Sequence, residues 1–499
     1  MSYIRLLGVR TPGSTVKQVD KSLLGEVNAP KYQDKPGDRN FMSSVRLLWQ
    51  NEITLRARRP KIIDVMRRYS DAWVARYPGD DAADADLIAY VEAYPKTHEF
   101  LFDRHILVTF KSTNAAGAIG MLCALKVKDP GLTLDLLSGV EGVESAEPAR
   151  ILWTLGRMVS GSPALTKLFD AGVDEKTWAR LRAAPEAAKF VGVFDDFLRR
   201  YGYRGPNEWE FASGSWRMRP HVPLKAIDRM RQSSDDAAPG ADFSAQSLNS
   251  RQAARCARRK LWLIDRLKFN RALPAAKVWQ VAREASKSAV IRSLDQTRRA
   301  FGELARRAAE RRGVADPSGF YMLGWGEFLQ HFRNERDLTA LIAERTRDYQ
   351  ALAEHIPPFL FEGEIPPLDT WQKRAGGEET WGQKGDILEG IGGSPGRVVG
   401  RARIMLDTEN PDVPEPGDIM VAPITDPSWT PLFLAAAGVV VDVGAVMSHS
   451  VIVSRDFGIP CFVSVTDATR IIPDGAMIEI DGDVGTVTIL STMAQPRAA

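Results

Sequence analysis

The stretch GAVMSHSVIVSRDFGIP, residues 444–460, decides how the C-terminal part of this chain folds. An apolar run of strand character leads into it, and a Gly-Ala turn follows. Ser448, His449 and Ser450 then open an amphipathic helix, which Gly458 ends. We therefore expect His449 to lie at a helix N-terminus.

His449 in that position has the chemistry of a phosphoryl carrier. The backbone N–H groups of a first helical turn lack intrahelical partners, and the helix dipole favours anions. A phosphoryl group on the imidazole would be held there, and a neutral imidazole is a competent nucleophile near pH 7. Ser448, Ser450 and Arg455 are the candidates for supporting the phosphate. The alternative is that His449 is only a capping or surface histidine.

This segment resembles the phosphohistidine, or swivelling, domain of the phosphoenolpyruvate-utilising enzymes, whose signature is Gly-Gly-x-x-Ser/Thr-His-x-x-x-Val-x-Arg-x-x-Gly-Ile-Pro. Ala445 replaces the second glycine, and Ser450-Val451 stand where two small residues are usual. Three flanking segments resemble the family's domain-opening hairpin, next strand and helix, and closing strands; they are residues 393–404, 416–433 and 474–489. The matching signature residues are Gly444, Ser448, His449, Val453, Arg455, Gly458, Ile459 and Pro460.

Three further segments are similar to the rifampicin phosphotransferases and the phenylphosphate-synthase-like enzymes of this family; they span residues 201–220, 311–329 and 425–433. The resemblance implies a dikinase-type phosphotransferase whose histidine is charged by an ATP-grasp domain. The sequence has no motif for that domain, no Gly-x4-Gly-Lys-Ser/Thr loop and no phosphoenolpyruvate-binding barrel. We therefore expect ATP and Mg²⁺ on a separate ATP-grasp subunit of a hetero-oligomer, and no cofactor or metal bound by this chain alone.

The acceptor that the resemblance implies is a small, phenolic compound activated for catabolism. The first alternative is the hydroxyl of an antibiotic, as in the rifampicin phosphotransferases. The second is that the chain is a non-enzymatic phosphocarrier or regulatory module, whose helical region only docks other proteins.

A second group of candidate residues lies in the segment 201–220. Arg204, Trp209, Glu208 and Glu210 form a dense polar and aromatic cluster, in which a carboxylate can take the acceptor proton and an arginine can steady the phosphate. The alternative is an ion pair at a helix terminus. His105 is the other candidate general base, because Asp103 lies two residues before it and an apolar run follows it.

The pattern predicts a multidomain fold with a mainly α-helical part followed by a small β/α domain. Residues 1–355 are expected to form a mainly helical acceptor-binding region, 356–387 a flexible connector and 388–495 the phosphohistidine swivelling domain. The clearest helical spacing is in Arg251–Phe269 and Ala285–Arg312. The expected strands are Val398–Met405, Ile419–Val421, Gly438–Asp442, Cys461–Val465, Met477–Ile480 and Thr486–Leu490.

The composition excludes several classes of partner. The 66 basic and 63 acidic side chains nearly balance, which gives no overall case for nucleic acid. The basic stretches 251–260 and 306–312 fit solvated helix faces, or a docking surface for the partner subunit. Neither a signal peptide nor an apolar run of membrane-spanning length is found, and the three cysteines lack metal-ligand spacing. We expect a cytoplasmic protein without a membrane partner.

Overall fold

The computed structural model describes residues 60–129, 131–140, 147–232, 243–312, 316–333, 336–356, 365–373, 381–406, 414–415, 417–425, 429–433, 436–444, 448–481 and 485–492. Its chain forms two compact units. The first contains Tyr69–Leu107 and Gln296–Glu379, and the second contains Val108–Asp295 and Thr380–Ala499, with Leu55–Arg68 added. The expected connector, 356–387, lies partly outside the described residues.

The first unit is built from helices and one two-stranded ladder. Its core is aromatic: Trp73 stacks on Tyr90 with ring centroids 4.4 Å apart, and Phe301 stacks on Phe328 at 3.8 Å. Its elements include the end of α4 (Lys61–Ala75), the first part of α5 (Asp84–Leu122), the end of α13 (Leu263–Arg312), α14 (Trp325–Phe332), α15 (Thr339–Ala353) and the antiparallel pair β1 (His355–Ile356) and β2 (Gln372–Lys373).

Helix α5 continues into the π-helical turn η1 (Cys123–Val127), and the combined helix Asp84–Val127 is long and apolar enough to cross a membrane by length and composition. Its buried side chains nevertheless follow a seven-residue repeat. Leu87, Tyr94, Leu101 and Val108 lie on one stripe and are almost fully buried. Such a narrow stripe is typical of a helix that packs in a bundle.

Eight further helical segments make up the N-terminal part of the second unit. Phe190, Phe194 and Phe197 line one face of α10 and stack on one another, and Trp216 stacks on Phe197. The segments are α6 (Leu132–Leu136), α7 (Glu147–Ser160), α8 (Pro163–Asp170), α9 (Thr177–Ala183), η2 (Pro185–Ala187), α10 (Ala188–Tyr201), α11 (His221–Met230) and α12 (Phe243–Lys260).

The prediction of helical structure over residues 251–269 is wrong in one respect, because two helices share this segment. Helix α12 ends at Lys260 and α13 begins at Leu263, so the chain reverses between them. No glycine or proline marks this reversal. It depends on tertiary packing, since Leu261 is buried and the Nε of Arg258 donates to the Oδ1 of Asn270 across the turn at 2.8 Å.

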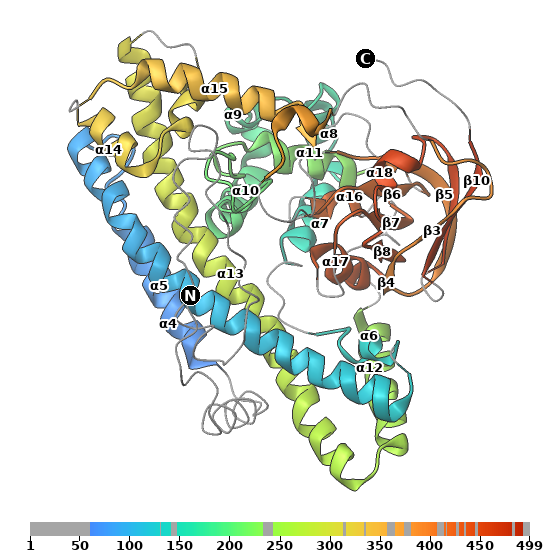
Figure 1. The fold of residues 1–499 in the computed structure, drawn as a ribbon. Coiled ribbons are helices and arrows are strands. Elements are labelled where there is room, and N and C mark those ends of the chain that lie inside the picture. Colours follow the sequence, from blue (N-terminus) through green and yellow to red (C-terminus); the bar gives the residue numbers. More distant parts are fainter. Residues whose placement is uncertain are drawn as a thin grey trace. The chain divides into compact units, whose positions relative to one another are not determined.

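The C-terminal part of the second unit is a mixed eight-stranded sheet with the order β3-β10-β9-β5-β6-β7-β8-β4 (Figure 1). Strands β5 to β8 are parallel and the other pairings are antiparallel. The strands are β3 (Ile387–Glu389), β4 (Ile391–Ser394), β5 (Arg397–Ile404), β6 (Ile419–Ala422), β7 (Gly438–Val441), β8 (Cys461–Val463), β9 (Met477–Asp481) and β10 (Thr486–Ser491).

All six strands expected from the sequence are confirmed, to within one or two residues at each end. The hairpin expected over residues 393–404 is wrong, because β4 pairs with β8 at one edge of the sheet while β5 pairs with β9 and β6. Gly396, with φ of 117°, makes the turn that separates β4 from β5. Strands β3 and β4 were not expected.

Helices cover both faces of the central strands. Helices α16 (Thr430–Phe433) and α17 (His449–Phe457) contribute to a core with Met420 and Val439, whereas α18 (Ala468–Ile471) contributes to a core with Val421 and Val440. Strands β6 and β7 are therefore buried along their whole length. This is the pattern of parallel strands covered on both faces.

Candidate phosphoryl-transfer site

Helix α17 places His449 at its first residue. The preceding Ser448 is extended, with φ of −72° and ψ of 164°, and its carbonyl accepts from the backbone N–H of Ile452 at 3.1 Å. Gly458 ends the helix in the left-handed conformation, with φ of 70°. The predicted helix, its start and its stop are all confirmed.

The first turn of α17 is not capped by its own N-cap side chain. The hydroxyl of Ser448 makes no capping hydrogen bond and lies 2.9 Å from the Oγ of Ser450 instead. Three or four N–H groups at a helix start normally need such a partner. An uncapped first turn suits an anion, so a phosphoryl group on His449 would lie where the helix dipole favours it.

Two residues of the sheet domain orient the imidazole. Its Nδ1 lies 3.2 Å from the Oγ1 of Thr425, and its ring meets that of Phe433 edge to face, at 5.8 Å between centroids and 86° between planes. In the tautomer whose Nδ1–H donates to Thr425, Nε2 is the unprotonated nitrogen. That nitrogen is then the nucleophile.

Arg455, expected to support the phosphate, makes a different contact. Its Nε donates to the carbonyl of Gly393 at 2.8 Å, and the side chain is buried. This hydrogen bond fastens α17 to β4. Ser450 is also buried, so of the expected phosphate-supporting residues Ser448 is the more accessible hydroxyl.

A buried cluster of charges lies on the helical side of the second unit. Arg204 Nη1 donates to Glu208 Oε1 at 3.1 Å, and Lys287 Nζ lies 2.9 Å from Glu208 Oε2. Arg204 Nη2 also donates to the hydroxyl of Ser288 at 3.0 Å. Both members of the Arg204–Glu208 pair are only 1% exposed. Burial opposes the charge of Glu208, but Lys287 and Arg204 outweigh it and hold its pKa below the usual value.

Glu284 completes this cluster, one helical turn before Ser288. Its Oε1 accepts from Arg283 Nη2 at 3.0 Å, and the side chain is buried. Burial would raise its pKa, yet Arg283, Lys287 and Arg204 together lower it to about 2. Both glutamates are therefore ionised at neutral pH.

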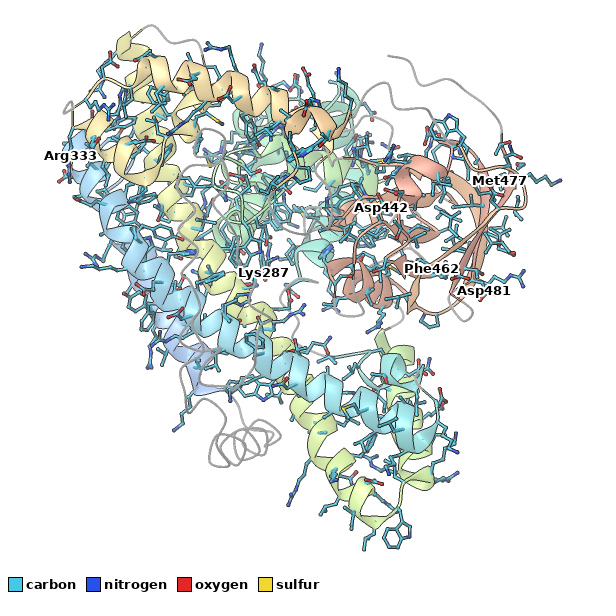
Figure 2. The ribbon with its side chains drawn as sticks, viewed as in Figure 1. Lys287, Arg333, Asp442, Phe462, Met477 and Asp481 are labelled. Carbon is cyan, nitrogen blue, oxygen red and sulfur yellow. The ribbon has the colours of Figure 1, made fainter. Side chains whose placement is uncertain are left out.

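His449 lies within electrostatic reach of this cluster. Burial is the main reason that its pKa falls from 6.5 to about 3; Lys287 and Arg204 lower it further, while Glu284 and Glu208 oppose them. The imidazole is therefore neutral at physiological pH and retains its nucleophilic lone pair. All of these residues belong to the second unit. Helix α16 contacts α11 there, and Lys287 is labelled on α13 in Figure 2.

The other residues expected at the acceptor site lie elsewhere. Trp209 is 43% exposed and Glu210 is exposed as well, with its Oε1 accepting from the backbone N–H of Ala212 at 3.0 Å. His105 belongs to the first unit, on α5, where its ring contacts that of Phe102. Of the acceptor-site candidates, Arg204 and Glu208 lie within electrostatic reach of His449.

Sequence analysis missed Glu284, Lys287 and Thr425. A signal for the first two was present, because Gln280, Glu284 and Lys287 recur at helical spacing inside a stretch of small apolar residues. Polar side chains on the inner face of a helix are unusual unless they are paired or functional.

No metal site accompanies this cluster in the part of the chain that the structure describes. There, no group of three or more His, Cys, Asp or Glu residues could hold a metal ion. Cys123 and Cys461 are buried, and Cys256 is exposed.

Two protein families match the two sides of this site. Residues 104–284 match the fourth domain of rifampicin phosphotransferase, and residues 414–485 match the mobile domain of the PEP-utilising enzymes. These two matches are consistent with the PEP-utilising enzyme family. The first match contains Arg204, Glu208 and Glu284, and the second contains His449.

Curated relatives match along most of the chain. The prodigiosin synthesizing transferase PigC of Serratia marcescens is 29% identical over 382 residues, which cover 74% of this chain and 42% of PigC. A rifampicin phosphotransferase of Streptomyces sp. is 30% identical over 374 residues, covering 71% of this chain and 41% of the relative. That of Bacillus cereus is 41% identical over 105 residues, covering 21% and 12%. The chain thus spans about two-fifths of the length of its longer-matching relatives.

Proposed function

We propose that this chain is the phosphoryl-transferring part of an ATP-driven, dikinase-type phosphotransferase, with phosphorylated His449 as the intermediate. One observation carries the proposal: His449, whose pKa is lowered to about 3, opens a helix that its own N-cap side chain does not cap, within electrostatic reach of Glu208, Glu284, Arg204 and Lys287. Phosphoryl transfer depends mainly on positioning and charge stabilisation, which is what such a cluster supplies.

The transfer step needs three events at this cluster. The acceptor oxygen attacks phosphorus, the N–P bond to His449 breaks, and its electron pair returns to the imidazole. Lys287 and Arg204 stabilise the negative charge of the phosphoryl group in the transition state of the transfer. The acceptor hydroxyl proton passes to a carboxylate, which leaves a phosphate ester and a neutral His449.

Glu284 is the better base of the two glutamates. Glu208 is held by both Arg204 and Lys287, whereas the hydrogen bond that Glu284 accepts comes from Arg283. A phosphoryl group on His449 adds about two negative charges next to these carboxylates, which raises their pKa values and restores basicity. We assign Glu208 the positioning of the two cations.

A cavity of about 410 Å³ in the second unit is the proposed acceptor pocket. Its wall on α13 is mostly apolar, from Val278 to Ala285, and Lys277, Arg67 and Asp64 are its charged lining residues. A helix rises 1.5 Å per residue, so the middle of this wall, at Val281, lies about 9 Å along the axis from Lys287. A single aromatic ring bearing a hydroxyl suits this size and lining. We therefore favour a small phenolic acceptor.

An antibiotic hydroxyl is the second candidate acceptor. It is favoured by the match of residues 104–284 to the fourth domain of rifampicin phosphotransferase. For either acceptor, we propose that the phosphoryl donor is a separate ATP-grasp subunit that holds ATP and Mg²⁺, and that the chain works in the cytoplasm. The segment 356–387 would let the swivelling domain move between donor and acceptor.

The transfer half-reaction can be tested with this chain alone. If His449 exchanges phosphate with the acceptor, the purified chain incubated with phenyl phosphate and labelled phenol will move the label into phenyl phosphate. His449 will carry acid-labile phosphate meanwhile. Label exchange with rifampicin phosphate and rifampicin, but not with the phenol pair, would overturn the phenolic assignment in favour of the antibiotic.

The donor half-reaction separates the enzyme from a mere carrier. With the cognate ATP-grasp protein, ATP and Mg²⁺, we expect His449 to be phosphorylated and phosphate ester to accumulate when a phenol is added. Phosphorylation without turnover of any acceptor would support the carrier hypothesis. Absence of phosphorylation in both half-reactions would contradict the whole proposal.

A further inference from the structure

The turn between α12 and α13 exposes an unusual set of large apolar side chains. Trp262 and Leu263 are 78% and 76% exposed, and Ile264 and Leu267 are more than half exposed. Soluble proteins expose single apolar residues routinely, but a contiguous group of this kind marks an interaction surface. We call these four residues, with Leu125, the apolar tip.

Leu125 joins this group from the end of another helix. It lies in η1 and is 66% exposed. The neighbouring Lys126 pairs with Asp265 of α13, with 3.9 Å between Nζ and Oδ2. This ion pair places the end of η1 against the turn. In Figure 1, α5 and α12 converge at the same end of α13.

Positive charge surrounds the apolar tip. Asp265, already paired with Lys126, is the acidic residue within the turn itself. The basic residues within or next to the tip are Lys126, Lys128, Arg258, Arg259, Lys260, Arg266 and Lys268. Except for the half-buried Arg258, they are all exposed.

The tip is held in place by packing behind it. Leu261 and Phe269 flank the exposed residues and are both buried. The hydrogen bond from Arg258 to Asn270 ties the two helices together at 2.8 Å. The packing of this helical hairpin therefore fixes Trp262 and Leu263 in exposed positions.

We propose that the apolar tip binds the surface of an anionic lipid bilayer, by inserting Trp262 and its aliphatic neighbours while the lysines and arginines contact phosphate headgroups. Tryptophan, leucine and isoleucine beside a dense basic rim are the composition of peripheral membrane contacts. Long basic side chains can lie along the apolar surface with their charges at headgroup level. Protein interfaces, in contrast, are depleted in lysine, and Lys126, Lys128, Lys260 and Lys268 all belong to this rim.

The tip is separate from the transfer site. Trp262, just before the start of α13, and Lys287, within it, are 25 residues apart, which corresponds to about 38 Å along a helix. Substitutions in the apolar tip should therefore weaken membrane binding without affecting phosphoryl transfer, and substitutions at the transfer site should do the reverse. A bilayer-bound enzyme would meet acceptors that partition into lipid.

Vesicle cosedimentation tests this proposal. We expect the full chain to sediment with vesicles of phosphatidylcholine and phosphatidylglycerol, and at least tenfold less with phosphatidylcholine alone. Binding should weaken as salt rises, because the attraction is partly electrostatic. The double variant Trp262→Ser/Leu263→Ser should lose binding by tenfold or more. The matched control is Val399→Ser/Leu406→Ser, which changes two exposed apolar residues of the sheet domain and should bind as the wild type does.

An environment-sensitive dye gives a second readout. In a Cys256→Ser background, a dye on Leu263→Cys should shift to the blue on adding phosphatidylglycerol vesicles, whereas a dye on Val399→Cys should not. Equal binding of the tip variant and the control would overturn the proposal. So would a concentration-dependent dimer that the tip variant abolishes, because the tip would then be a contact between copies.

Discussion

Strand pair β6–β7 and the middle of helix α13 are both deeply buried, but they differ in the side chains that they bury. Every residue of β6 and β7 is buried and apolar. Between Lys277 and Asp295, by comparison, α13 buries polar residues as well as apolar ones; the polar ones are Gln280, Glu284, Ser286, Ser288, Ser293 and Asp295. Burying polar groups costs free energy unless they are paired, whereas burying apolar groups stabilises the fold. The strands therefore stabilise the domain that carries His449, and α13 contributes Glu284 and Lys287 to the charge cluster that we propose acts on a phosphoryl group.

Replacing the nucleophile should have the largest effect. His449→Asn removes the nitrogen that forms the N–P bond, so we expect both phosphorylation and label exchange to disappear. His355→Asn is the matched control, because His355 is a half-buried histidine on β1, in the other unit. Retained exchange in His449→Asn, measured with phenyl phosphate and labelled phenol, would show that another residue carries the phosphate.

Changes in α13 should come next and should separate the two half-reactions. Glu284→Gln removes the proposed base, and general-base catalysis contributes about 10²- to 10⁴-fold, so exchange should fall by about that factor. Phosphorylation of His449 by the ATP-grasp protein should persist, because that step uses a different site. Ser286→Ala provides the control on the same helix. An equal loss of phosphorylation in Glu284→Gln would contradict the assigned role.

A change in β6 should affect stability and leave the chemistry alone. Met420 is fully buried, and Met→Ala at such a site costs about 2–5 kcal/mol. We expect the chemical denaturation midpoint of Met420→Ala to fall, while label exchange at 15 °C stays within about twofold of the wild type. Leu406→Ala, at an exposed position, should change the free energy of unfolding by less than about 0.5 kcal/mol. A large loss of exchange in the folded Met420→Ala variant would mean that the strands do more than hold the site.

The smallest expected effect is on stability against pH. His449 has a pKa near 6.5 when unfolded and about 3 when folded, so between these values the unfolded chain binds more protons. The free energy of unfolding is therefore unaffected by this titration above pH 6.5, and it falls as the pH drops from 6.5 toward 3. From pH 7 to pH 5 we expect the wild type to lose about 1 kcal/mol more than His449→Asn, less than the unscreened shift implies because the ring is partly exposed. Parallel denaturation curves of both proteins at the two pH values provide the check.

Local patterns predicted much of the sheet domain. The six predicted strands alternate or run apolar between turn residues, and α17 carries its own start and stop signals in Ser448 and Gly458. Strands β3 and β4 were missed because they are only three and four residues long, and β4 contains two glycines, which carry little strand signal. The pairing of β4 with β8 joins segments about 70 residues apart, which no local pattern specifies.

The candidate site was predictable only in part. His449 and the Arg204–Glu208 pair could be proposed because each lies in a recognisable motif. Lys287 pairs with Glu208, which lies nearly 80 residues away in the sequence. In the sequence alone, a lysine in a regular helix is expected to lie on a solvated face, so nothing indicated this pairing. The same limit applies to Trp209 and Glu210, because sequence proximity to Glu208 does not reveal that the chain turns them to the surface.

The neutral imidazole at the start of α17 also gives the protein a selective chemical handle. An acylating reagent such as diethylpyrocarbonate attacks only unprotonated histidine, and at pH 5 a histidine with an ordinary pKa is almost entirely protonated. His449, with its pKa of about 3, stays reactive under those conditions wherever the reagent can reach it. Labelling in mild acid would then report which molecules in a sample still carry an unoccupied nucleophile, since a phosphorylated or ligand-covered ring would not be modified.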